Sequence, residues 1–152
     1  MTRAEHAKQL FEEGYACSQA VALAFKDLTN VNEIDLKKLT LPLGGGLGRL
    51  RLTCGAITGL AVIVGLVFAK DENTSENKLA TYKIIQDLTE RFKTVHGTII
   101  CEELLSKPSV SVEIGGVPSE RTKEYYKERP CSLIVYNAAK VLEDYLTESK
   151  IL

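Results

Sequence analysis

The sequence of 152 residues has no tryptophan, one methionine and almost no net charge, −1 at pH 7. Because lysine and arginine are not in excess, the composition gives no indication of binding to nucleic acid or to an anionic membrane surface. The first residues, Met1 to His6, lack the apolar run of a secretory signal. We therefore expect a cytoplasmic protein, in which thiols are normally kept reduced.

Several common motifs are also absent. The four cysteines include no Cys-x-x-Cys pair, which argues against zinc-finger, thioredoxin-type and c-type haem sites. The glycine run at 44–48 is followed by no Gly-Lys-Ser/Thr and preceded by no predicted strand, which argues against a Walker loop or a dinucleotide-binding loop. Any site that the cysteines share must therefore be assembled by the tertiary fold. The cysteines are Cys17, Cys54, Cys101 and Cys131.

An uncharged segment runs from Leu52 to Ala69. Its length is at the lower edge of a membrane span, but it contains several glycines and threonines and has no flanking aromatic belt. A helix that is apolar on all sides is also what the centre of a helical bundle requires, so we predict a central buried helix at about 53–69. Gly55 and Gly59, one turn apart, would let a neighbouring helix approach closely.

Apolar residues recur at helical spacing through most of the remaining chain. Asn32 is a predicted N-cap, and Gly97 is a predicted helix end. The composition, 45% apolar and 26% charged, fits one globular domain over 1–152. The predicted fold is all-α, a compact bundle of about six or seven helices. The predicted helices are 4–14, 17–28, 30–39, 53–69, 75–95, 101–105 and 131–147.

The region 106–129 is the least regular part of the sequence. Residues 106–119 contain two prolines and two glycines, and the alternation of Val110, Val112 and Ile114 with polar residues indicates a short extended piece. Residues 120–129 are dense in charge, and we expect them to be solvated.

All four cysteines fall at or next to a predicted helix start, where unpaired N–H groups lower thiol pKa values and stabilise anions. The effect is expected to be strongest at Cys54, with Arg49 and Arg51 just upstream. Clustered thiolates ligate metals or iron–sulfur clusters, and they also form exchangeable disulfides. Free cysteines commonly pack as small buried hydrophobes instead. The residues alone leave these interpretations open.

The glycine run also has two interpretations. It either forms a nest of backbone N–H groups that faces an anion, or it is a tight connection that lets the chain pass close to other helices. Arg49, which follows the run, either balances thiolate charge in the site or is an exposed surface arginine. The residues that would form such a cofactor-binding wall are Gly44, Gly45, Gly46, Gly48 and Arg49.

Two stretches of the chain are Gly44-Gly45-Gly46-Leu47-Gly48-Arg49 and Thr53-Cys54-Gly55-Ala56-Ile57-Thr58-Gly59. They resemble the signature of the C_GCAxxG_C_C family, small four-cysteine proteins to which redox activity is ascribed. Cys17, Cys101 and Cys131 match the first, third and fourth cysteines of that signature. The resemblance covers nearly the whole chain and implies a compact helical protein whose four cysteines act together in redox chemistry. Similar domains occur in some bacterial electron-transfer proteins, so the resemblance also implies an iron–sulfur or other metal centre.

We therefore expect the four cysteines to converge on one site. The favoured interpretation is ligation of an iron–sulfur cluster or another metal, with electron transfer to a redox partner that the sequence does not identify. The alternative is a metal-free thiol–disulfide oxidoreductase, in which an exposed, low-pKa Cys54 attacks and another cysteine resolves the intermediate. A third interpretation is a structural or interaction module with inert buried cysteines. The sequence predicts no membrane span and leaves a homodimer open.

Overall fold

The computed structural model describes residues 1–106 and 112–152, and its helices confirm the predicted all-α class. The described residues form no strand, although Thr53 and Ile100 make an isolated antiparallel bridge. Two short 3-10 turns, η1 (Lys26–Leu28) and η2 (Leu41–Leu43), connect longer helices. The α-helices of the described part are α1 (Arg3–Glu12), α2 (Cys17–Leu23), α3 (Glu33–Thr40), α4 (Gly55–Phe68), α5 (Ser75–His96), α6 (Cys101–Leu105), α7 (Lys123–Glu128) and α8 (Cys131–Glu148).

Local side chains set where several helices begin and end. Thr2 forms a capping box with Glu5 at the start of α1. The Asn32 side chain accepts a hydrogen bond from the Asp35 N–H at the start of α3, which confirms the predicted N-cap. Gly97 ends α5 in the left-handed conformation, at φ 81°, as predicted.

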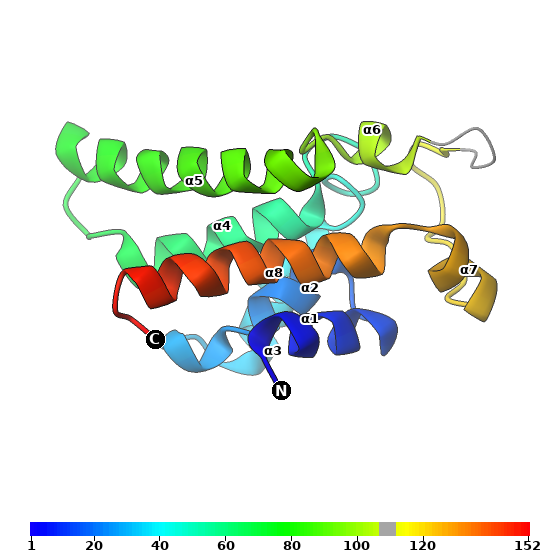
Figure 1. The fold of residues 1–152 in the computed structure, drawn as a ribbon, viewed down its shortest axis with the longest axis horizontal. Helices are drawn as coiled ribbons and strands as arrows, with labels where there is room; N and C mark the ends of the chain where they lie inside the picture. Colours follow the sequence, from blue (N-terminus) through cyan, green and yellow to red (C-terminus); the bar gives the residue numbers. More distant parts are fainter. Residues whose placement is uncertain (107–111) are drawn as a thin grey trace.

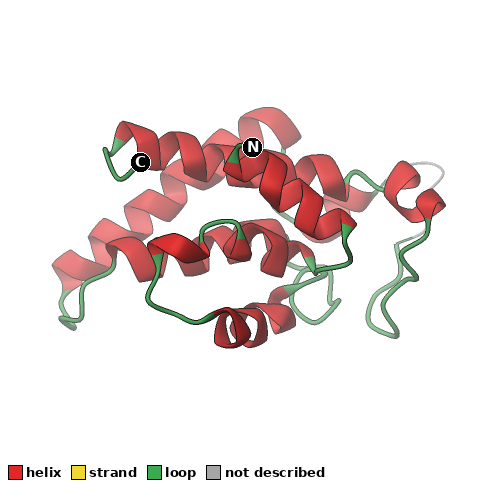
Figure 2. Ribbon diagram, turned by 90° about the horizontal axis from the view of Figure 1, so that it is seen from below, coloured by secondary structure: helices red, strands yellow, loops and turns green. Residues whose placement is uncertain are grey.

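The core lies where α2, α4 and α8 meet. α8 packs against α1, α2, α4 and α5, and α4 packs against α2, α5 and α8. Figure 1 shows α5 along one side of α4 and α8, with α1 and α3 on the other side, and Figure 2 shows the same bundle from below. Val21, Leu60 and Val135, one from each central helix, are fully buried. Burial of side chains of this size stabilises the fold by about 1.5–3 kcal/mol each.

The predicted central helix corresponds to α4. Ala56, Leu60 and Ile63 in its first part have no exposed surface, whereas Leu66 near its end is 42% exposed. The helix is therefore central, but it is buried mainly over its first half, at the end that carries Cys54. Among the described residues, no helix combines the length and the apolar character that a membrane crossing requires.

Two helical regions differ from the prediction. α2 ends at Leu23, and the rest of the predicted 17–28 helix is a short turn followed by η1. Residues 120–129, predicted as a solvated charged segment, contain α7, whose N-cap Thr122 accepts from the Tyr125 N–H. Tyr125 and Tyr126 pack against the core, so this helix has one apolar side. The lysines and glutamates around the two tyrosines led the sequence analysis to predict a solvated segment instead.

The extended piece predicted around Val110 and Ser111 lies outside the described residues. The described residues 112–114 that follow it have no regular secondary structure.

Gly59→Ala tests the close approach of α2 and α4. A Cβ at Gly59 would lie 2.5 Å from the carbonyl oxygen of Ser18 in α2, so one helix would have to move. We expect the free energy of unfolding to fall by about 1–3 kcal/mol, as in overpacked interiors. Urea unfolding followed by circular dichroism measures this change.

Gly65→Ala in the same helix is the matched control. A Cβ there meets nothing within 4 Å, and alanine is favoured over glycine in a helix by about 1 kcal/mol. Gly65→Ala should therefore be at least as stable as the parent chain. Equal stability of the two variants would contradict the packing argument.

Candidate functional site

A short antiparallel backbone pairing places Cys54 beside Cys101. The Cys54 N–H donates to the Ile99 carbonyl at 2.7 Å, and the Cys101 N–H donates to the Leu52 carbonyl at 2.6 Å. These bonds hold the N-cap of α4 next to the first residue of α6. Main-chain hydrogen bonds thus bring together two cysteines that are far apart in the sequence.

Cys17 and Cys131 are the first residues of α2 and α8. All four cysteines therefore begin or cap a helix, which confirms the positional pattern predicted from the sequence. Gly55 makes room for Cys17, because a Cβ at Gly55 would collide with the Cys17 sulfur. Cys17 thus lies against Gly55, the first residue of α4, which directly follows Cys54 in the sequence.

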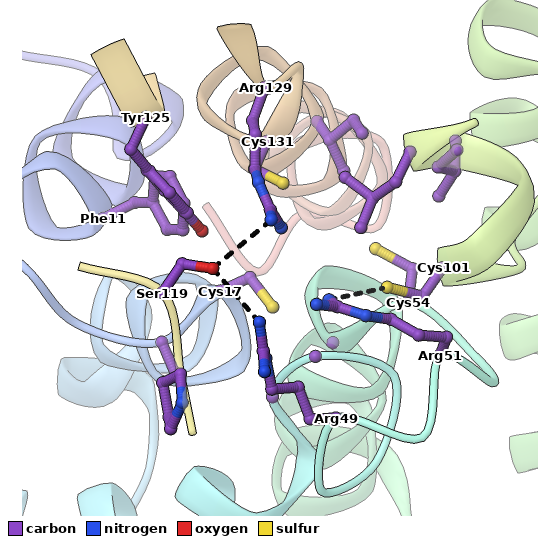
Figure 3. Close-up of a pocket in the computed structure, with 18 of the residues that line it drawn as sticks. Phe11, Cys17, Arg49, Arg51, Cys54, Cys101, Ser119, Tyr125, Arg129 and Cys131 are labelled. Atoms are coloured by element: carbon purple, nitrogen blue, oxygen red, sulfur yellow. Dashed lines mark hydrogen bonds between the residues drawn. The ribbon is translucent and has the colours of Figure 1, made fainter. Parts of the chain in front are cut away.

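The four free thiols line one cavity with a volume of about 330 Å³. Figure 3 shows their sulfurs turned toward a common space, with Arg49 and Arg51 on one side and Arg129 on another. Phe11 and Tyr125 supply aromatic surface to the same wall. The structure brings the predicted cysteines together, and their chemical role stays a prediction.

Burial raises the pKa of three of the thiols. Desolvation raises the pKa of Cys17, raises that of Cys54 well above its ordinary value and raises that of Cys131 to about 12. At Cys54 the N–H groups of Ala56 and Ile57 lower the pKa, as predicted for a helix start, but burial outweighs them. Cys54 is only 6% exposed, so the prediction of an exposed, low-pKa Cys54 is wrong.

Cys101 differs from the other thiols because a guanidinium contacts its sulfur. Arg51 donates from Nη1 to Cys101 Sγ at 3.7 Å and from Nε to the Glu113 carbonyl at 2.8 Å. The arginine is 5% exposed. A buried guanidinium stabilises negative charge on a sulfur within its reach.

Arg49 is also buried, with 9% of its surface exposed, so the interpretation as an exposed surface arginine is wrong. It donates to the Gly115 carbonyl at 2.6 Å and to the Ser119 hydroxyl at 3.1 Å. The Ser119 hydroxyl also accepts from Arg129 at 3.4 Å, as the dashed lines in Figure 3 show. Arg49 therefore ties the glycine run to the segment before α7.

The glycine run is wound in the left-handed sense. Gly45, Gly46 and Gly48 have φ values of 65°, 75° and 56°, and Leu47 and Arg49 continue the turn at 72° and 66°. Each non-glycine residue in this conformation costs roughly 1–2 kcal/mol. Strain of this kind persists where surrounding contacts hold it, and here the Arg49 side chain supplies two of them.

Three of the five N–H groups of the run donate to carbonyls of the preceding turn η2, which favours the tight-connection interpretation. The Gly48 N–H donates to the Pro42 carbonyl at 2.7 Å, and the Arg49 N–H donates to the Gly44 carbonyl at 3.2 Å. The Gly45 N–H instead forms a hydrogen bond with Cys17. This bond lowers the pKa of Cys17, but burial raises that pKa by more.

Two further arginines reach the cavity from the α7 region. Arg121 donates to the Phe11 carbonyl at 3.2 Å and lies 4.5 Å from the centroid of the Phe11 ring. Arg129 lies 5.0 Å from the centroid of the Tyr125 ring. Sequence reasoning missed both, although Arg129 stands two residues before Cys131 and the neighbouring tyrosines signalled a packed segment.

The predicted site residues lie on the cavity wall with one exception. Gly46 packs behind Cys101, and a Cβ at this glycine would lie 2.7 Å from the Cys101 Cβ. The predicted residues that line the cavity are Cys17, Cys54, Cys101, Cys131, Gly44, Gly45, Gly48 and Arg49.

Within the described residues, no group of three or more His, Cys, Asp or Glu side chains is arranged to hold a metal ion. The four thiols surround a space, and neither a carboxylate nor an imidazole is among the described groups that line it. The favoured interpretation, metal or iron–sulfur ligation, is therefore not confirmed and stays a prediction.

One family model matches residues 15–145, and its description reads "Putative redox-active protein (C_GCAxxG_C_C)". The match covers most of the chain, so the chain belongs to this family and the resemblance found in the sequence is confirmed. No curated protein and no solved structure matches the chain.

Alkylation of Cys131 tests the effect of burial on the thiols. At pH 8, a thiol whose pKa is raised to about 12 carries roughly a thousandfold less thiolate than an ordinary thiol near 9. We expect iodoacetamide to label Cys131 in the native protein about a thousandfold more slowly than in urea-unfolded protein, measured by peptide mass spectrometry. Native and unfolded rates within about tenfold of each other would contradict the raised pKa.

Proposed function

We propose that this chain is a metal-free thiol–disulfide redox protein whose thiols react with a small disulfide inside the cavity. The observation that carries the proposal is the contact between Arg51 and Cys101 in a cavity that four free thiols share. Membership in a family described as redox-active supports the same chemistry.

Cys101 is the proposed attacking thiol, because Arg51 would stabilise its thiolate. The Cys101 thiolate attacks a substrate disulfide, R–S–S–R, to form a Cys101–S–S–R bond and release RS⁻, which takes up a proton. A second protein thiol then displaces the other RS group. Two protein thiols lose two electrons and two protons in forming one disulfide, and the substrate gains them as two RSH molecules.

Cys17 is the proposed resolving thiol. Burial is the main cause of the raised pKa of Cys54 and Cys131, and charge on Cys17 raises both further. Charge on Cys101 in turn adds to the raised pKa of Cys17. Cys17 and Cys131 are each within electrostatic reach of the other three thiols. We choose Cys17 because the N–H groups of Gly45 and Ser18 lower its pKa, whereas burial raises that of Cys131 to about 12.

Metal ligation is the second candidate, because four cysteines are the usual complement of an iron–sulfur cluster. Bound to these cysteines, a cluster would supply one-electron transfer. Among the described residues no group of side chains is arranged to hold a metal, so we derive no step through one. The ligands would be Cys17, Cys54, Cys101 and Cys131.

Replacing the two proposed reactive cysteines separates the two steps. We expect Cys101→Ser to lower the rate constant for reduction of dithiodiethanol, a neutral disulfide, by about 100-fold or more, because the attacking thiol is lost. Cys17→Ser should react at the first step and stop as a mixed disulfide on Cys101, which intact-mass and peptide mass spectrometry detect. Cys54→Ser is the matched control, and it should complete both steps. Unchanged formation of the internal disulfide in Cys101→Ser would contradict the assignment.

Metal content separates the two candidate functions. For protein purified without oxygen, we expect less than about 0.1 iron, zinc or copper per chain, with all four thiols titrating after unfolding in urea. Elemental analysis and a thiol titration on the same sample measure both quantities. Iron near two or four per chain, with a matching loss of titratable thiols, would overturn the metal-free proposal.

A further inference from the structure

The arginines of this chain fall into two classes. The two that lie away from the cavity each pair with a carboxylate: Arg3 with Asp27 at 2.6 Å, and Arg91 with Glu148 at 2.8 Å. In the described part of the chain, the four that line the cavity form no ion pair with any carboxylate. The cavity arginines are Arg49, Arg51, Arg121 and Arg129.

Neutral groups hold these four guanidiniums in place. Arg49 and Arg51 donate to the backbone carbonyls of Gly115 and Glu113, and Arg121 donates to that of Phe11. No aspartate or glutamate is among the described residues that line the cavity. The Glu113 carboxylate approaches Gly116 from near Arg49 without forming an ion pair and lies outside the lining. Because a guanidinium does not lose its proton in a protein, the described lining itself carries positive charge and no carboxylate.

Three of the four thiols do not supply that negative charge, and a thiolate on Cys101 would balance only one of the four arginines. Burial raises the pKa of Cys17, Cys54 and Cys131, so these three stay protonated at neutral pH. A buried charge without a partner is costly, and two of the four arginines, Arg49 and Arg51, are more than nine-tenths buried. A counter-charge from outside the chain would remove this cost.

We infer that the cavity binds a small disulfide that carries carboxylate groups, and that the four arginines select it by its negative charge. The fork of N–H donors on a guanidinium matches a carboxylate, and the aromatic surfaces of Phe11 and Tyr125 accept the apolar part of such a molecule. The volume of about 330 Å³ is at the small end of ligand pockets. The inference rests on the proposed thiol–disulfide function and adds the class of its substrate.

Three disulfides of similar length and different charge test this selectivity. They are dithiodipropionate, which is a dianion, dithiodiethanol, which is neutral, and cystamine, which is a dication. We expect the reduced protein to react with the dianion at least about tenfold faster than with the neutral disulfide, and most slowly with the dication. Added salt should reduce the preference, because it screens the charges. Equal rates for all three would overturn the inference.

Arg129→Gln removes one cavity charge, and Arg91→Gln removes one that lies elsewhere and pairs with Glu148. The two variants have the same net charge. We expect the preference for the dianion to fall about threefold or more in Arg129→Gln and to persist in Arg91→Gln. Arg129→Lys, which keeps the charge, should restore it. A loss of equal size in Arg91→Gln would mean that net charge alone decides, and would overturn the inference.

Sulfate distinguishes failure of the inference from failure of the proposed function, because it binds without reacting. At constant ionic strength, sulfate should raise the Tm of Arg91→Gln more than that of Arg129→Gln. If none of the disulfides reacts but sulfate gives this pattern, the thiol chemistry fails and the anion site stands. If the disulfides react without charge preference and sulfate has no effect, the anion site fails and the thiol chemistry stands.

Discussion

Removal of ionisable groups from water is the constraint on which this site depends. Arg49 and Arg51 are buried and cannot lose their protons, so the fold surrounds them with carbonyl and hydroxyl acceptors. The thiols of Cys54 and Cys131 have a neutral form available, and burial holds them in it. The same desolvation therefore leaves the arginines charged and these thiols uncharged.

The wall of the cavity depends on contacts that are distant in the sequence. Arg49 and Arg51 both adopt positive φ, which side chains other than glycine rarely do. The Gly115 N–H donates to the Arg49 carbonyl at 2.8 Å, while the Arg49 side chain donates back to the Gly115 carbonyl. This reciprocal pair, with the bond from Arg51 to Glu113, offsets the backbone strain. The glycine run and the segment before α7 thus hold each other in shape.

The sequence predicted the local features, the central helix and the meeting of the four cysteines, but not the surroundings of each site residue. Helix starts at Asn32 and at the cysteines follow from capping and periodicity, which involve residues within one or two turns. The pKa of Cys54 depends on what covers its sulfur, and no local pattern contains that information. The same limit applies to Arg121, whose partners include Phe11, more than a hundred residues away. The place of Arg121 on the cavity wall depends on the packing of the α7 region onto the core, which the sequence does not show.

In the proposed chemistry, negative charge enters the cavity in two ways: a thiol ionises, or an anion binds. Both are stabilised by the same four guanidiniums, so each disfavours the other. A disulfide has no proton to lose, so oxidation of Cys101 and Cys17 removes the one thiolate that Arg51 would stabilise and leaves that role to a ligand. By linkage, an anion that prefers the oxidised protein stabilises the disulfide by the same factor. In this proposal the arginines couple the redox state of the thiols to the occupancy of the cavity, and the low dielectric of a buried site strengthens the coupling.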